Sequence, residues 1–157
     1  MLENFLPTNI IAIGVVSASV ILLVYFAVKT LITANLFQQG TNLYQAEDYQ
    51  GAEAAFRKVI AINSTNDVVR LLLGDTLSKQ GNHTEAIALF REVINRSPKN
   101  PQAYLRLANI LMQQEQTEEA QINLKQARDL LMKQRQPETA KRLSVLLDKM
   151  DAKAKVK

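Results

Sequence analysis

The chain begins with a long run of apolar residues. Ile10 to Val28 reads IIAIGVVSASVILLVYFAV, without one charged side chain. As a helix rising about 1.5 Å per residue, this run nearly spans a hydrocarbon core of about 30 Å. We therefore expect a transmembrane helix over residues 10–32, preceded by a short N-terminal segment, residues 1–9.

A cleaved signal peptide is the alternative interpretation of this run. Residues 1–9 contain no Lys or Arg, and the run is longer than the usual 7 to about 15 apolar residues of a signal peptide, so both features favour a retained anchor. The nearest base, Lys29, follows the run. The positive-inside rule then predicts that the rest of the chain lies in the cytoplasm, or in the stroma of a plastid.

Beyond residue 32, small and large apolar residues recur every 34 positions. Some of these positions hold small residues, which let two antiparallel helices approach, and others hold larger residues, which fill the spaces between the repeats. The aligned sets are Gly40, Gly74 and Ala108; Ala52, Ala86 and Ala120; Phe56, Phe90 and Leu124; Leu43, Leu77 and Leu111; and Val59, Val93 and Ala127. The pattern predicts three helix–turn–helix units, residues 33–66, 67–100 and 101–134.

This spacing resembles the tetratricopeptide repeat (TPR) family, in which each unit is a pair of antiparallel helices, A and B. The turns between A and B would be EDYQGA, GNHTEA and EQTEEA, and the units would connect through INSTND and RSPKNP. A capping helix is expected over residues 137–150, followed by a basic tail, residues 151–157. The expected fold class is all-α: a single N-terminal transmembrane helix, a three-repeat TPR helical solenoid and a C-terminal capping helix.

Two further features of the repeat region bear on the structure. Arg70 stands where the other two repeats have Leu36 and Tyr104. No Gly or Pro lies between Val15 and Gln39, so the anchor is expected to continue into the first A helix. That continuity would hold the repeats about 10 to 20 Å from the lipid surface.

The net charge of +4 is unevenly distributed. Residues 125–157 hold ten Lys or Arg against four acids, whereas residues 33–124 hold eight against ten. A basic end can contact anionic lipid, an acidic partner or RNA, but no aromatic residue follows Tyr104 to stack on bases. The composition therefore favours a solvated basic face and argues against a nucleic-acid partner.

The sequence offers no convergent set of residues for chemistry. Cysteine is absent, and the one histidine, His83, falls in an A-to-B turn where packing or solvent contact is expected. A metal site needs three or four converging ligands, and no glycine-rich phosphate loop is present. We therefore predict no enzyme activity, no catalytic residue, no cofactor, no metal and no small-molecule substrate.

The family resemblance implies a protein-binding groove lined by residues of the A helices. The corresponding positions here are Phe37, Gln38, Thr41, Tyr44, Gln45, Leu71, Leu72, Asp75, Ser78, Lys79, Leu105, Arg106, Asn109, Met112 and Gln113. Family members that grip a C-terminal carboxylate use several Lys, Arg and Asn residues there, and this chain keeps only Arg106 and Asn109. An apolar ligand, either an amphipathic helix or an extended segment, fits better. The alternative for each apolar residue is packing against a neighbouring helix.

The overall layout resembles the membrane-anchored TPR proteins of cyanobacteria and plastids that assist photosystem I assembly at the thylakoid. That resemblance implies a non-catalytic assembly factor, with the bilayer contacted through residues 10–28 and the repeats on the cytoplasmic or stromal side. Its partners would be membrane-protein subunits or assembly intermediates, including those of photosystem I. Two alternatives stay open: a bacterial inner-membrane protein of envelope chaperoning or secretion, and a subunit that tethers a soluble enzyme.

Overall fold

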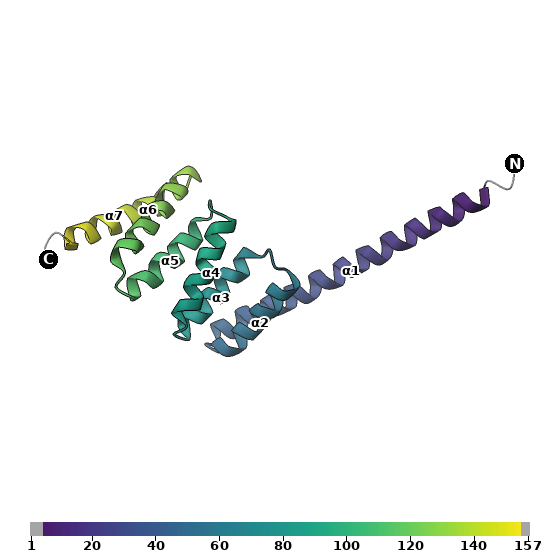
Figure 1. Ribbon diagram of the computed structural model, residues 1–157, viewed down its shortest axis with the longest axis horizontal. Helices are drawn as coiled ribbons and strands as arrows, with labels where there is room; N and C mark the ends of the chain where they lie inside the picture. Colours follow the sequence, from purple (N-terminus) through teal and green to yellow (C-terminus); the bar gives the residue numbers. More distant parts are fainter. Residues whose placement is uncertain (1–4, 155–157) are drawn as a thin grey trace.

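The computed structural model describes the backbone of residues 5–154 and the side chains of residues 10–152. Within this range the chain forms seven α-helices and no strand (Figure 1). Their bounds are α1 Phe5–Gln45, α2 Tyr49–Ile62, α3 Asp67–Lys79, α4 His83–Arg96, α5 Pro101–Gln113, α6 Thr117–Lys133 and α7 Pro137–Ala154. The expected all-α solenoid is confirmed. Residues 1–4 of the expected N-terminal segment and 155–157 of the expected basic tail lie outside the described residues.

The helix α1 is uninterrupted over 41 residues, and Lys29 is its only charged residue. In the described part of the chain it is the one helix long and apolar enough to cross a membrane, and none of its most apolar window is buried. The side chains of Ile10, Ile21 and Leu23 are each more than 60% exposed. As the sequence predicts, the apolar run continues into the first A helix without a linker.

The helices after the anchor pack as successive antiparallel pairs. The C-terminal part of α1 packs on α2, α3 packs on α4, and α5 packs on α6. Each B helix also packs against the A helix that follows it, and α7 covers the end of the array by packing on α6. The repeats therefore lie side by side in chain order, with α7 at the end farthest from the anchor (Figure 1).

The helix ends are set by local hydrogen bonds. Three helices have an N-cap whose side chain accepts a backbone N–H: Asp48 from Gly51, Asn66 from Val69 and Asn100 from Gln102. Two positions after each A helix ends there is a residue with a left-handed backbone, and the N–H of the residue after it bonds back to the last helical turn. These left-handed residues are Glu47, Gly81 and Glu115, 34 positions apart.

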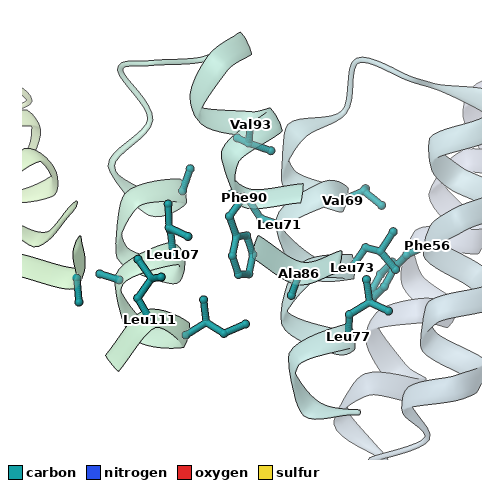
Figure 2. Close-up of a cluster of buried hydrophobic side chains, with 14 of the residues drawn as sticks. Phe56, Val69, Leu71, Leu73, Leu77, Ala86, Phe90, Val93, Leu107 and Leu111 are labelled. Atoms are coloured by element: carbon teal, nitrogen blue, oxygen red, sulfur yellow. The ribbon is translucent and has the colours of Figure 1, made fainter. Parts of the chain in front are cut away.

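The small residues predicted at the helix crossings occupy those crossings. Ala52, Ala86 and Ala120 are completely buried. Gly40 lies so close to Phe56 that an added Cβ would be 2.6 Å from Cε1 of its ring. The buried rings and leucines of successive repeats then form one continuous core (Figure 2), so that each repeat is stabilised by its neighbours.

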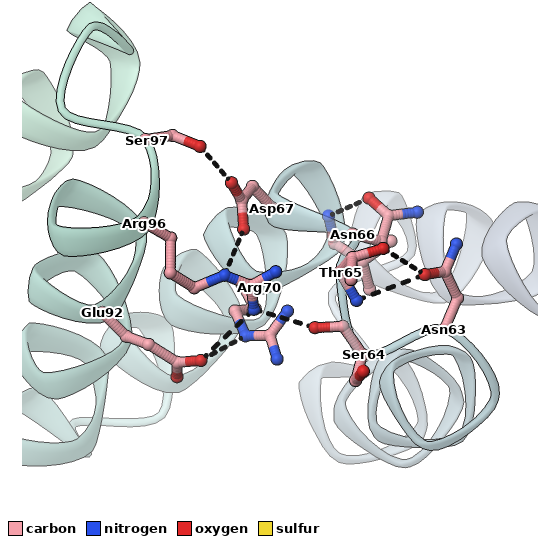
Figure 3. Close-up of polar contacts among 10 residues, drawn as sticks. Asn63, Ser64, Thr65, Asn66, Asp67, Arg70, Glu92, Arg96 and Ser97 are labelled. Atoms are coloured by element: carbon pink, nitrogen blue, oxygen red, sulfur yellow. Dashed lines mark hydrogen bonds and ion pairs between the residues drawn. The ribbon is translucent and has the colours of Figure 1, made fainter.

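A polar cluster joins the first and second repeats (Figure 3). Arg70 is 7% exposed and its Nε lies 2.9 Å from Oε1 of Glu92. Arg96 donates from Nη1 to the carbonyl oxygen of Ser64 at 2.8 Å, and its Nε lies 3.5 Å from Oδ1 of Asp67. The departure of Arg70 from the repeat pattern is thus accommodated by a carboxylate on α4.

The capping helix α7 buries an apolar stripe against α6. Ala140 and Leu147 are 1% and 3% exposed, and Leu143 and Met150 are partly buried. This helix continues to Ala154, beyond the expected end at residue 150, because no residue that stops a helix follows Met150.

Candidate partner-binding groove

All fifteen predicted groove residues lie on A helices. They occupy residues 37–45 of α1, 71–79 of α3 and 105–113 of α5. The helices α3 and α5 contact each other directly, so these positions of neighbouring repeats adjoin in space. We call the fifteen residues together the A-helix face.

The exposure of the A-helix face varies along it. Its exposed members are polar and its partly buried members include every apolar residue except one. The exposed residues are Gln38, Gln45, Lys79, Asn109 and Gln113, and the partly buried ones are Phe37, Thr41, Tyr44, Leu72, Asp75, Ser78, Leu105, Arg106 and Met112.

Leu71 differs from the rest of this face because it belongs to the core. It is 5% exposed and packs among the buried side chains that surround Phe90 (Figure 2). Leu105 holds the same position in the next repeat and is only partly buried. For Leu71 the structure therefore favours the packing alternative, whereas Leu105 keeps surface that a ligand can contact.

An ion pair crosses the middle of the A-helix face. Nε of Arg106 on α5 donates to Oδ2 of Asp75 on α3 at 2.7 Å, and the two side chains are 27% and 26% exposed. Nη1 of Arg106 also donates to Gln102 at 3.1 Å. Arg106 is therefore already paired, and the face lacks the free cluster of bases that would hold a C-terminal carboxylate.

Tyr44 on α1 is influenced by the charges of this ion pair, and we refer to Tyr44, Asp75 and Arg106 together as the polar row. Burial raises the pKa of the Tyr44 phenol, and the negative charges of Asp75 and Tyr49 raise it further, against the opposing effect of Arg106. Burial also raises the pKa of Asp75, although the hydrogen bond and charge of Arg106 and the charge of Lys79 act to lower it. The row thus consists of one ion pair, between α3 and α5, and of the phenol of Tyr44 on α1, whose pKa the charges of that pair influence.

Apolar side chains flank the row. Leu72, Leu105 and Met112 pack against the core while keeping an accessible edge. Tyr44 stacks edge-on with Tyr49, with 5.6 Å between ring centroids. A face with apolar edges around a central ion pair suits an amphipathic segment of another protein.

Among the described residues, no group of three or more His, Cys, Asp or Glu has the geometry to hold a metal. His83 lies within the predicted turn GNHTEA and is the first residue of α4. Its Nδ1 is buried without a hydrogen-bond partner.

A cleft where α1 leaves the repeats was missed by the sequence analysis. We call it the Lys29 cleft: it has a volume of about 580 Å³ between α1 and the end of α2. Its lining residues are Phe26, Lys29, Thr30, Thr33, Ala34, Phe37, Ile62, Asn63, Ser64 and Asn66. This cleft could have been predicted from the length of α2. A helix of 14 residues is about 21 Å long, so α2, which runs back along α1, ends beside the part of α1 that follows the apolar run.

The successive antiparallel helix pairs define a helical-repeat protein. A family model of the tetratricopeptide repeat matches residues 43–88 and 77–143. The chain belongs to the tetratricopeptide repeat family. A search of curated protein sequences finds no significant match.

Solved structures share this fold. SycD, a type III secretion translocator chaperone of Yersinia enterocolitica, is 24% identical with a TM-score of 0.71, over 78% of this chain and 93% of SycD. PcrH from Pseudomonas aeruginosa, in complex with the chaperone binding region of PopD, is 21% identical with a TM-score of 0.70, over 77% of this chain and 92% of PcrH. The TPR2B domain of yeast Sti1, in its pHsp70 complex, is 20% identical with a TM-score of 0.70, over 78% of this chain and 98% of that domain.

Proposed function

We propose that this protein is a non-catalytic, membrane-anchored scaffold that binds other proteins close to the membrane through its A-helix face. It would act as an assembly factor for membrane complexes. The observation that carries the proposal is the continuity of α1, which joins an exposed apolar run to the first A helix without a linker.

The exposed part of α1 needs an apolar environment. Burial of apolar surface is favourable by roughly 25 cal/mol per Å², and the large apolar side chains from Ile10 to Val28 are each about half exposed or more. A lipid bilayer would cover them all at once. The same run has the length that a bilayer requires.

The rigid connection limits which partners the protein can reach. From Lys29 to Gln45 the helix advances about 24 Å, so the part of the A-helix face on α1 would be held within that distance of the headgroups. Partners would then be membrane-protein subunits or their assembly intermediates. Photosystem I subunits at the thylakoid are the particular partners that the layout suggests, with the repeats on the cytoplasmic or stromal side.

The chemistry of the A-helix face indicates the kind of segment that it would bind. Leu72, Leu105 and Met112 offer apolar contacts, and the ion pair of Asp75 and Arg106 offers a charged centre. An amphipathic helix or extended segment with one polar side chain toward this pair fits both. The structural neighbours PcrH and Sti1 are seen in complexes with segments or partners of other proteins, which supports a protein ligand.

Co-purification after mild detergent solubilisation tests the proposal. Leu105→Glu places a charge on the A-helix face, and Ile122→Glu is a matched control because Ile122 is 67% exposed on the B helix α6. A charge left unpaired in a desolvated contact costs several kcal/mol. Leu105→Glu should therefore lower the recovery of membrane-protein partners more than about tenfold. If Leu105→Glu retained the membrane-protein partners and Ile122→Glu lost them, the proposal would be contradicted. If one soluble enzyme were recovered in place of membrane-protein partners, the result would favour a tethering subunit.

Membrane topology separates the envelope alternative. Because the chain has no cysteine, a single cysteine at Glu115 gives one site for a membrane-impermeant thiol reagent. We expect labelling only after the membrane is permeabilised. Labelling of intact cells would place the repeats outside and favour envelope chaperoning or secretion.

A further inference from the structure

Because successive helices run in alternating directions, the loops that join them gather at two opposite ends of the helices. We call these the anchor side and the far side of the solenoid. The helix α1 runs away from its apolar half, α2 runs back, and the later helices continue to alternate (Figure 1). The connections 63–66, 97–100 and 134–136 therefore lie on the side from which α1 enters. The turns 46–48, 80–82 and 114–116 lie on the opposite side (Figure 1).

The residues that line the Lys29 cleft show that the anchor side of the solenoid lies close to the apolar run. Ala61 and Ile62, at the end of α2, line a second, smaller cavity together with Tyr25, Val28 and Ile32 of α1. The connection that begins at residue 63 is thus level with the end of the charge-free run. If the run crosses a bilayer, this end of the solenoid faces the headgroups directly.

The two ends carry opposite charge. We count each connection with the four helical residues on either side, as residues 59–70, 93–104 and 130–140 on the anchor side. These hold five bases and two acids. The corresponding segments on the far side, residues 42–52, 76–86 and 110–120, hold one base and six acids.

The bases on the anchor side are of two kinds. Arg70 and Arg96 are engaged with Glu92 and Asp67 in the polar cluster of Figure 3. The other three, Lys99, Lys133 and Arg135, are exposed, and in the described part of the chain no ion pair involves them. Their charge is free to act on whatever lies opposite.

We propose that the anchor-side end of the solenoid, with Lys29, Lys99, Lys133 and Arg135 as its bases, is a binding surface for anionic phospholipid headgroups. The inference rests on the proposed membrane anchor, which brings this end to the bilayer. Basic residues near an anionic surface are attracted over about one Debye length, about 10 Å at 0.1 M salt. The acidic far end lies about one helix length away, roughly 20 Å, where the field of the surface is largely screened, so the bases of the anchor side carry the attraction.

The experiment uses the full chain in liposomes of phosphatidylcholine alone or of phosphatidylcholine mixed with phosphatidylglycerol. A fluorophore is attached to a single introduced cysteine, either Asn100→Cys on the anchor side or Gln116→Cys on the far side. Lipids with a quencher on the headgroup then report how close each label lies to the surface. We expect stronger quenching of the Asn100→Cys label in the anionic liposomes, reversal at high salt, and no change for the Gln116→Cys label.

Charge variants identify the residues responsible. The triple variant Lys99→Gln, Lys133→Gln, Arg135→Gln should lose the dependence on lipid charge. The matched control Arg91→Gln, Lys125→Gln, Lys149→Gln removes three exposed bases outside both the A-helix face and the anchor-side connections, and it should keep the dependence on lipid charge. Equal thermal melts of the two variants would exclude unfolding as the cause.

The outcomes separate this inference from the anchor on which it rests. A chain that does not float with either liposome would overturn the proposed anchor. A chain that floats with both, but whose Asn100→Cys quenching ignores lipid charge, would overturn the lipid-binding surface while leaving the anchor in place. Loss of a protein partner by the triple variant, without any lipid effect, would also overturn it and assign the surface to an acidic protein.

Discussion

Gly74 on α3 lies directly against the aromatic ring of Phe90 on α4, so closely that a Cβ on Gly74 would collide with Cε1 of the ring. The first repeat has the same pair in Gly40 and Phe56. The third repeat has Ala108 and Leu124 at the equivalent positions, both buried. Where the A helix has Ala in place of the smaller Gly, the B helix thus has Leu in place of the larger Phe.

This matching predicts that Gly74→Ala destabilises the protein despite the better helix propensity of Ala. Overpacking of a core costs about 1 to 3 kcal/mol, against a gain of up to about 1 kcal/mol from replacing Gly in a helix. We expect a net loss of about 1 to 2 kcal/mol in the free energy of unfolding, measured by denaturant melts of the purified chain.

The rescue variant is Gly74→Ala combined with Phe90→Leu, which reproduces the pair of the third repeat. The two substitutions should be less damaging together than the sum of their single effects, with a coupling of about 1 kcal/mol. Additive effects would show that Gly74 and Phe90 do not constrain each other.

Arg70 provides a second prediction because it is a buried charge at a position that is Leu36 in the first repeat. Removal of the buried charge leaves behind Glu92, whose side chain is 45% exposed and stays solvated, whereas removal of Glu92 leaves the buried charge of Arg70 unpaired. We expect Arg70→Leu to keep or raise the free energy of unfolding, by up to about 2 kcal/mol. Glu92→Ala should lower it by roughly 2 to 3 kcal/mol. A reversed order in denaturant melts would contradict this account of the cluster.

The ion pair on the A-helix face predicts a pH effect. Burial raises the pKa of Asp75 and Arg106 opposes that rise, so Arg106→Gln should raise the pKa of Asp75 further, as followed by carbon NMR of its carboxyl group. Because the folded state then binds the proton more tightly than the unfolded state, Asp75 favours folding as the pH falls through its pKa and opposes folding above it. An unchanged pKa in Arg106→Gln would show that the two groups do not interact in solution.

The fold could be predicted from the sequence because the repeat pattern reports packing directly. Only small residues fit at Gly40, Gly74 and Ala52, so their spacing along the chain marks where each helix pair crosses and how long each unit is. The absence of Gly and Pro between Val15 and Gln39 likewise predicted that the anchor continues into the first A helix without interruption.

The details of the site could be predicted only in part. Leu71 and Leu105 hold the same repeat position but differ in burial, because burial depends on the neighbouring helices and not on the position alone. Asp75 and Arg106 were both placed on the face, but their pairing was not recognised. Their separation of 31 residues is one repeat less about one helical turn, which sets them side by side on adjacent A helices.

Site-specific photocrosslinking in intact membranes tests the central claim, that the A-helix face binds a protein at the membrane surface. A photoreactive amino acid is placed at Leu72 or Met112 on that face, and at Ile122 as a control, since Ile122 is exposed on α6. We predict that both positions of the A-helix face crosslink to the same membrane-protein subunit and that the control does not. Crosslinks from Ile122, with none from Leu72 or Met112, would contradict the account.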